Sequence, residues 1–372
     1  MEEKESNASS NLTIMRVLEL YSGIGGMHFA LCESGVAAKV VAAVDINPVA
    51  NDVYRHNFPG TFLVNRNIQS ISAQELNKLN VDTILMSPPC QPFTRLGLKK
   101  DVIDNRACSL LHVLDLISEL RSLRYLLLEN VKGFEMSQMR DKLVDCLEKC
   151  GYAYRELILS PCQFGVPNSR HRYYLLAKRK DLKFRFKRTS LETDLSPELS
   201  RLLPESKHSL LARKSGKINS KSGRMCYTLN NVLENIEEFK YLVPSELLRK
   251  RAWVFDIRTS ESNGSCCFTK GYRHYAEGTG SVYCPFSDEI IRLKYDEATN
   301  HEDDSAKTRI LSELKLRFFS PREVCRLMCF PESFDFPEHT TDKQKYRLLG
   351  NSINVHVVSR LILLLCNESE NN

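Results

Sequence analysis

The sequence predicts an α/β protein with a doubly wound, mainly parallel sheet and a second, smaller lobe. Short apolar runs alternate with helical patterns between residues 14 and 182, which is typical of repeated βαβ units. A glycine-rich turn directly follows the first apolar run. The composition becomes basic and polar from Lys178 onward, where we expect a different substructure to begin.

The composition is that of an ordinary globular chain with a mildly basic charge balance. The 372 residues carry a net charge of +6 and are 42% hydrophobic, which permits an anionic partner without requiring one. The 13 cysteines form no paired CxxC motifs with zinc spacing, so we expect a reducing compartment, cytoplasm or nucleus, and no metal site. No signal segment and no run long enough to cross a membrane is visible, so no membrane association is expected.

The first strand is expected over residues 16–21, after a disordered leader of residues 1–13. A Ser-Gly-Ile-Gly-Gly turn follows and leads into a helical pattern up to Gly35. Strand, glycine turn and helix in this order open a nucleotide-binding unit, although a tight turn without a ligand has the same pattern. The candidate cofactor residues of this turn are Tyr21, Ser22, Gly23, Gly25 and Gly26.

The second strand, residues 40–44, ends in Asp45, about twenty residues beyond the glycines. An acid in this place can accept hydrogen bonds from the two ribose hydroxyls of a nucleoside cofactor. His28 stands where a third close-packing glycine would complete the dinucleotide fingerprint. The pattern therefore favours a shorter cofactor without a pyrophosphate, such as S-adenosylmethionine.

A helix is expected over residues 48–57 and a short strand over residues 62–64. Asn67 and Ile68 lie at the end of that strand. A polar group and an apolar side chain in this position could hold adenine, and a plain loop is the alternative.

The stretch Met-Ser-Pro-Pro-Cys-Gln-Pro-Phe-Thr, residues 86–94, ends a strong apolar run. Pro88, Pro89 and Pro92 cannot continue a sheet ladder, and they restrict the residues before them. Cys90 is therefore expected to be held in one orientation at the carboxyl end of a strand, where open α/β sheets place their chemistry. A buried structural cysteine is the alternative.

Two further strands are expected to end in polar residues. Residues 125–128 lead into Glu129, an acid that is costly to bury unless it has a task or a partner, although a surface acid or helix cap is an alternative. Arg170 and Arg172 alternate just before the strand at residues 173–177, so both face one side of an extended chain. Two guanidinium groups together suggest recognition of an anion or a base oxygen, and a surface pair is the alternative.

The second half of the chain has three distinctive parts. Residues 178–188 and 207–224 are basic, the first with interleaved aromatics, which suits a nucleic-acid backbone with unstacked bases or a solvated loop. Residues 288–304 are acidic and are expected to form a loop. A final helix from about residue 343 is interrupted by a Leu-Gly-Asn-Ser-Ile sequence, which a closely approaching ligand would explain.

The order of these parts resembles the cytosine-C5 methyltransferase family over residues 14–366. Within it the chain is similar to the eukaryotic branch called DNA methyltransferase homologue two, whose members methylate transfer RNA; the Cys-Phe-Thr block at residues 267–269 is that branch's signature. Asn168 and Asn67 depart from the glutamine and aspartate of the wider family, and the second departure weakens the adenine contact. The matching motifs are Gly23-Ile24-Gly25-Gly26, Asp45, Pro89-Cys90-Gln91, Glu129-Asn130-Val131, Arg170-His171-Arg172 and Gly350-Asn351-Ser352.

The resemblance implies that a Cys90 thiolate adds to C6 of cytosine, so that C5 can accept a methyl group from S-adenosylmethionine. Glu129 would hold the N3 and N4 edge, Arg172 would hold O2, and Arg170 would orient the set. It implies further cofactor contacts from Ile46, Asn67, Ile68, Pro89, Asn351 and Ser352. It implies substrate contacts from Lys178, Arg179, Lys180, Cys267, Phe268, Thr269 and Lys270.

The resemblance also implies the partner and the domain plan. The expected substrate is cytosine 38 in the anticodon loop of aspartate tRNA, with weak acceptance of DNA, and the expected state is a monomer. The catalytic domain would comprise residues 14–182 and 339–366, the target-recognition lobe residues 183–338, and the tail residues 367–372. A DNA cytosine methyltransferase, a non-catalytic nucleic-acid-binding protein and a nicotinamide oxidoreductase are the alternatives.

Overall fold

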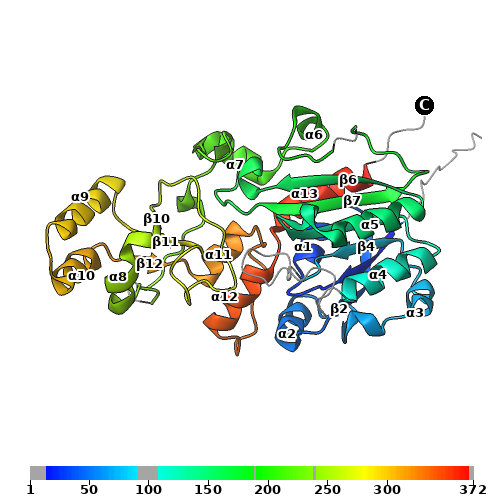
Figure 1. Ribbon diagram of the computed structural model, residues 1–372, viewed down its shortest axis with the longest axis horizontal. Coiled ribbons are helices and arrows are strands. Elements are labelled where there is room, and N and C mark those ends of the chain that lie inside the picture. The colour runs from blue at the N-terminus through cyan, green and yellow to red at the C-terminus, as the bar shows by residue number, and fades with distance from the viewer. Residues whose placement is uncertain (1–13, 90–107, 188–189, 238–239, 368–372) are drawn as a thin grey trace, which may run out of the picture.

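The computed structural model describes residues 14–89, 108–187, 190–237 and 240–367, and its main feature is a seven-stranded sheet (Figure 1). The strand order is β3-β2-β1-β4-β5-β7-β6, and β7 runs in the direction opposite to that of the other six strands. This confirms the predicted doubly wound sheet. The strands are β1 (Met15–Leu20), β2 (Ala38–Asp45), β3 (Leu63–Asn65), β4 (Thr83–Met86), β5 (Tyr125–Val131), β6 (Tyr152–Leu159) and β7 (Arg172–Arg179).

Helices cover both faces of this sheet, because successive strand residues point to opposite sides and both sides are apolar. Val17 packs in one core and Leu18 in the other. One face is covered by α1 (Gly26–Ser34), α2 (Pro48–Asn57) and α13 (Val355–Cys366), and the other by α3 (Ala73–Lys78), α4 (Cys108–Glu119) and α5 (Gln138–Lys149). Burial on both faces leaves the strand ends as the accessible parts of the sheet.

A small three-stranded sheet lies at the other end of the molecule (Figure 1). It consists of β10 (Asp256–Arg258), β11 (Ser281–Tyr283) and β12 (Arg317–Phe318). Three helices surround it, namely α8 (Ser245–Arg251), α9 (Asp288–Thr299) and α10 (Asp304–Ser312). The predicted acidic loop at residues 288–304 is therefore wrong, because these residues form α9 and the start of α10.

The segment with α6 (Pro197–Arg201), α7 (Lys207–Ser215), β8 (Lys217–Ile218) and β9 (Met225–Cys226) lies beside the large sheet in Figure 1. Arg360 of α13 donates a hydrogen bond to the carbonyl of Pro204 in this segment (3.2 Å). Residues assigned by sequence to the smaller lobe thus pack on the larger one. The lobe boundary at residue 183 stays a prediction.

The carboxyl-terminal helices connect the two parts of the molecule. Helix α11 (Pro321–Leu327) begins with the expected proline and a capping box between Ser320 and Glu323. Helices α12 (Asp342–Asn351) and α13 are separated by a short break, as the Gly-Asn-Ser sequence predicted.

Residues 342–366 are also long and apolar enough to span a membrane, contrary to the sequence expectation. In the structure 78% of their most apolar window is buried inside the protein, which is typical of a core helix.

Candidate active site

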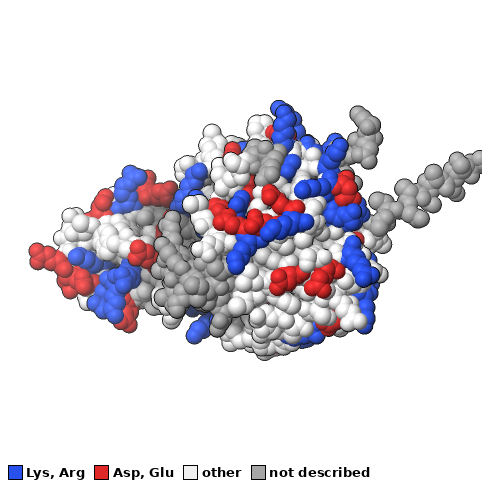
Figure 2. Space-filling view, turned by 45° about the vertical axis from the view of Figure 1, so that its right-hand side comes forward, with Lys and Arg blue, Asp and Glu red and all other residues white. Residues whose placement is uncertain are grey.

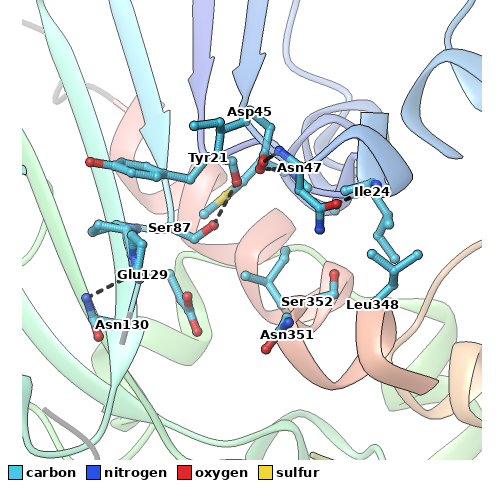
Figure 3. A pocket seen from close by; sticks show the side chains of 18 of the residues that line it. Tyr21, Ile24, Asp45, Asn47, Ser87, Glu129, Asn130, Leu348, Asn351 and Ser352 are labelled. Atoms are coloured by element: carbon cyan, nitrogen blue, oxygen red, sulfur yellow. Dashed lines mark hydrogen bonds between the residues drawn. The ribbon is translucent and has the colours of Figure 1, made fainter. Parts of the chain in front are cut away.

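A cavity of about 490 Å³ lies at the carboxyl ends of β1, β2, β4 and β5. Its walls also include Arg170 and Arg172, at the start of β7, and the break between α12 and α13. Figure 3 shows Asp45, Glu129 and Asn351 arranged around this one space. The residues that follow these strands lie close together because the carboxyl ends of parallel strands share one edge of a sheet.

The glycine turn forms the first wall of the cavity. The backbone N–H of Gly23 donates to Asp45 Oδ2 (2.8 Å), and that of Asn47 donates to Asp45 Oδ1 (2.8 Å). Burial raises the pKa of Asp45, and these N–H groups partly offset the effect. The turn therefore orients this acid in front of the cavity.

The glycines of this turn have different tasks. A Cβ on Gly26 would lie 2.7 Å from Ile353 Cγ1, so the close approach of α1 to the helix break needs glycine. Gly25 has a φ of 84° and packs against Phe58 and Tyr54 instead of lining the cavity. Ser22 is buried and also lies outside the lining, so neither of these two predicted cofactor residues lines the cavity.

The remaining predicted cofactor residues surround the same half of the cavity. Ile46 and Ile68 both line the cavity. The side chain of Ile46 is 65% exposed, whereas that of Ile68 is only 5% exposed. Asn67 caps a short turn by accepting a hydrogen bond from the backbone N–H of Gln69 (3.1 Å). Six predicted cofactor residues besides Asp45 line the cavity near these groups: Tyr21, Gly23, Gly26, Pro89, Asn351 and Ser352.

This half of the cavity fits S-adenosylmethionine. Its volume lies in the range of small-molecule sites, roughly 300–1,000 Å³. An acid placed for the ribose hydroxyls stands beside the apolar side chains of Ile46 and Ile68, which suit a flat adenine ring. Among the described residues no group of three or more His, Cys, Asp or Glu is arranged to hold a metal ion.

The second half of the cavity contains a buried acid and a guanidinium group. Arg172 Nε lies 3.3 Å from Glu129 Oε1, because the antiparallel pair β5–β7 places Arg172 opposite Val131. Burial raises the pKa of Glu129, while the charges of Arg172 and Arg170 oppose this shift. The carboxyl group therefore keeps a proton to higher pH than a free glutamate.

Arg170 connects three distant segments. It is 2% exposed, and its Nη1 donates to the carbonyl of Phe268 (2.9 Å). Its Nη2 donates to the carbonyls of Gly350 (3.1 Å) and Ser352. Because both terminal nitrogens of Arg170 donate to backbone carbonyls, this side chain holds the wall in place, which supports the orienting role expected for it.

The Cys-Phe-Thr segment packs against this arginine. Cys267 Sγ lies 3.3 Å from Arg170 Nη1 and 3.9 Å from Arg172 Nη2. Burial alone would raise the pKa of the Cys267 thiol, but the two arginines outweigh burial and lower it. A Cβ on Gly350 would lie 2.1 Å from the backbone nitrogen of Lys270, so only glycine fits there.

Two predicted substrate contacts are wrong because their side chains are buried. Phe268 is 2% exposed and packs edge-on to Tyr272 and Phe319. Lys178 is fully buried, and its Nζ donates to the carbonyls of Lys183 (3.4 Å) and Asn367 (3.2 Å). Thr269 is half-buried beside Gly350 and does not line the cavity, whereas Lys270 does.

Arg179 and Lys180 lie at the carboxyl end of β7, whereas the cavity lies near its amino end. Residues 178 and 179 pair with the amino ends of β5 and β6, at the sheet edge opposite the site. The Arg179 side chain is bound to Asp181 (3.0 Å). On the face shown in Figure 2, lysines and arginines are interspersed with acidic residues. Arg179 and Lys180 therefore lie away from the site.

Asn130 and Ser109 were not among the predicted site residues, and the predicted residue Cys90 lies outside the described residues. Asn130 Nδ2 donates to the carbonyl of Pro88 (3.4 Å), which joins β5 to the proline segment. Tyr21 Oη donates to Ser109 Oγ (3.0 Å), and both line the cavity. The Glu-Asn-Val sequence could have indicated Asn130, whereas nothing in the sequence marks Ser109. Cys90 lies outside the described residues.

A family model for C-5 cytosine-specific DNA methylases matches residues 15–365. The chain belongs to this family. It is therefore an S-adenosylmethionine-dependent enzyme that methylates C5 of cytosine, which confirms the predicted fold, cofactor and reaction.

Relatives of this methyltransferase cover almost its whole length. The chain is 47% identical to a protein of Spodoptera frugiperda named tRNA (cytosine(38)-C(5))-methyltransferase, covering 94% of this chain and 98% of the relative. A Homo sapiens protein of the same name is 42% identical, with 94% and 99% covered. A Dictyostelium discoideum protein named DNA (cytosine-5)-methyltransferase is 39% identical, with 96% and 95% covered.

The fold agrees with a solved relative. A crystal structure of a mutant DNMT2 of Spodoptera frugiperda matches with a TM-score of 0.82 at 46% identity. The match covers 95% of this chain and 100% of the other.

Proposed function

We propose that this methyltransferase acts on tRNA, at cytosine 38 in the anticodon loop of aspartate tRNA. The observation that carries the proposal is the 47% and 42% identity, over almost the whole chain, to two proteins named for methylation of cytosine 38 in tRNA. A target base must leave its stack to enter a cavity at a sheet edge, and this costs least in a single-stranded loop.

Glu129 and Arg172 are placed to hold the cytosine. A carboxyl group whose pKa is raised by burial can donate its proton to N3 and accept a hydrogen bond from the N4 amino group. Arg172 lies 3.3 Å from that carboxyl group and has donors for O2. Together they neutralise the charge that develops on the ring when C6 is attacked.

Cys90 is the proposed nucleophile. Its thiolate adds to C6 and forms an S–C bond, and the ring becomes an enamine that is nucleophilic at C5. S-adenosylmethionine, when bound, supplies the methyl group as an electrophilic sulfonium. Loss of the C5 proton and release of the Cys90 thiolate then restore the aromatic ring. The Cys90 assignment rests on the Pro-Pro-Cys-Gln sequence and the family mechanism.

The test is transfer of label from S-adenosylmethionine to aspartate tRNA and to duplex DNA. Wild type, Cys90→Ala and Cys32→Ala are compared, since Cys32 is an exposed cysteine of α1 outside the cavity lining. We expect label on tRNA with wild type and Cys32→Ala, and none with Cys90→Ala. Replacing cytosine 38 with uridine should also abolish incorporation. If tRNA with uridine at position 38 still incorporates label, cytosine 38 is not the methylated position.

DNA is the second candidate substrate, because the Dictyostelium relative is named as a DNA methyltransferase. Label on DNA alone would favour it, and label on both at unequal rates would indicate weak acceptance of DNA.

We also propose a monomer in the cytoplasm or nucleus. The described cysteines are all free, which supports a reducing compartment. Light scattering of the purified chain would test the monomer, and fluorescence microscopy of a tagged chain would test the location.

A further inference from the structure

Residues 269–280, here called the rim loop, form a closed and well-anchored loop. The backbone N–H of Thr269 donates to the carbonyl of Thr279 (2.9 Å), which joins the two ends of the loop. Tyr272 anchors its middle: this side chain is 4% exposed, and its hydroxyl donates to the carbonyl of Ser281 (2.6 Å). The same hydroxyl accepts a hydrogen bond from the backbone N–H of Phe319 (2.9 Å). The backbone of the rim loop is therefore fixed relative to the core.

The rim loop borders the cavity. Lys270 lines the cavity, and its backbone packs directly on Gly350 in the last turn of α12. Gly271 follows, and the ring of Tyr275 covers it, since a Cβ on Gly271 would lie 3.0 Å from Tyr275 Cδ2. The Tyr275 ring is thus adjacent to the residue that follows a cavity-lining lysine.

The rim loop presents two aromatic side chains to solvent. Tyr275 is 63% exposed, and the ring of His274, also exposed, stands edge-on to it with the centroids 4.6 Å apart. The backbone of Tyr275 is held by hydrogen bonds to Gly271 (3.0 Å) and from Thr279 Oγ1 (2.6 Å). The buried Tyr272 anchors the loop to the core, so anchoring does not account for the exposed ring of Tyr275. An exposed ring on an anchored backbone, five residues from the cavity-lining Lys270, suits stacking of a base that neighbours an extruded one.

Positive charge accompanies these rings. Lys270 is exposed on the cavity side. Arg273 lies 3.6 Å from Asp342 at the start of α12 and 5.6 Å from the centre of the Tyr241 ring, so its position is also defined. Aromatic faces next to cations form the usual surface for single-stranded nucleic acid, because bases stack while phosphates are neutralised.

We propose that the rim loop is a stacking platform on which Tyr275 holds a nucleobase next to the target cytosine in the RNA loop. His274 braces the ring of Tyr275, and Lys270 contacts the adjoining phosphate. The platform keeps the neighbouring base in place while the cytosine occupies the cavity. It accepts any base, because every base has a π-face. This inference rests on the proposed function.

The first experiment compares steady-state methylation of aspartate tRNA by wild type, Tyr275→Ala, Tyr275→Phe and Phe62→Ala. Phe62 is the matched control, since it is also 63% exposed but lies at the amino end of β3, away from the cavity. Loss of one stack should raise the KM for tRNA about tenfold in Tyr275→Ala and change kcat less than twofold. Tyr275→Phe keeps the ring and should retain wild-type KM. The Kd for S-adenosylmethionine should be unchanged in all variants.

The second experiment uses tRNA with an abasic site on either side of cytosine 38. One of the two should raise the KM of wild type about tenfold and leave that of Tyr275→Ala unchanged, because the two changes remove the same contact. Independent, multiplicative effects of both abasic sites would overturn the platform. If wild type methylates the tRNA and Tyr275→Ala has the same KM for it as Phe62→Ala, the platform is also overturned. A wild type that leaves tRNA unmethylated defeats the proposed function instead.

Discussion

The two halves of the cavity are held together over very different distances along the chain. In the cofactor half, Asp45 accepts hydrogen bonds from Asn47 and Gly23, which are 2 and 22 residues away. In the base half, Arg170 donates to carbonyls of Phe268 and Gly350, which are 98 and 180 residues away. The Asp45 contacts of the first half form within one βαβ unit, whereas the arginine contacts of the second half exist only after the chain has closed on itself.

Because of this difference, we expect substitutions in the two halves of the cavity to have different effects. A change in the cofactor half should affect mainly the affinity for S-adenosylmethionine. A change in the arginine network of the base half should reduce both activity and the free energy of unfolding, because the same contacts form the wall and connect the chain segments. The following variants test this division, beginning with the largest expected effect.

Arg170→Met removes the donors to three backbone carbonyls, those of Phe268, Gly350 and Ser352. A buried polar group without a partner costs roughly 1–3 kcal/mol, so we expect the free energy of unfolding to fall by about 4 kcal/mol or more. Activity should be lost as well. Denaturant unfolding followed by circular dichroism measures the first effect, and label transfer measures the second.

Arg172→Met is the control for this variant, because within the described part of the chain the Arg172 guanidinium donates to a single backbone carbonyl, that of His171 (2.8 Å). It should lose activity with a much smaller loss of stability. Equal losses of stability in the two variants would contradict the distinction between a positioning and a base-contacting arginine.

Glu19→Gln tests a second buried acid, which lies on β1 beneath the cofactor half. Burial raises the pKa of Glu19 to about 8, and the hydrogen bond from Tyr54 opposes this only in part. The folded state keeps the proton up to that pH, while the unfolded chain loses it near the ordinary value of 4.5. The stabilising contribution is therefore complete below that ordinary value and is lost as pH rises through the folded pKa.

Between pH 5 and pH 8 this loss should amount to roughly 3 kcal/mol in wild type and be absent from the uncharged glutamine variant. Unfolding free energies of both proteins at four pH values measure the difference. Parallel curves for the two proteins would show that Glu19 does not titrate in this window.

Glu129→Gln should lower kcat about 100-fold, since a proton can no longer pass to the base in the transition state. The Kd for S-adenosylmethionine should stay the same, because Glu129 belongs to the base half. Burial raises the pKa of Glu129, and the wild-type rate should decline as the pH rises through this raised pKa. The Glu129→Gln variant should lack that decline. Single-turnover rates between pH 5.5 and 9 measure it, and a matching decline in the variant would assign it to another group.

Asp45→Asn should have the smallest effect and be confined to the cofactor half. The amide keeps one acceptor for the backbone N–H groups of Gly23 and Asn47 but loses the charge that attracts ribose hydroxyls. We expect the KM for S-adenosylmethionine to rise about tenfold, with kcat at saturating cofactor within twofold of wild type. A fall in kcat like that of Glu129→Gln would mean that the two halves are not independent.

Sequence patterns predicted well those features that depend on neighbouring residues. The glycine turn with Asp45, the proline-led α11 and the break before α13 all follow from local backbone rules. The acidic composition of residues 288–304 predicted a loop, and this prediction was wrong. Ala298 and Tyr295 pack into the core, and Tyr295 Oη donates to the carbonyl of Ala252 (2.9 Å). Tertiary contacts overrode composition there.

The sequence by itself determined the order of strands and turns, and hence which polar residues end at the same edge of the sheet, because these follow from short-range periodicity and the geometry of parallel strands. Only the tertiary structure decided which side chains face the cavity. Lys178 and Phe268 are buried, while Cys267 meets two arginines and Gly350 accommodates the rim loop. The contact of Cys267 with Arg170 joins residues 97 positions apart, so it depends on how the whole chain packs.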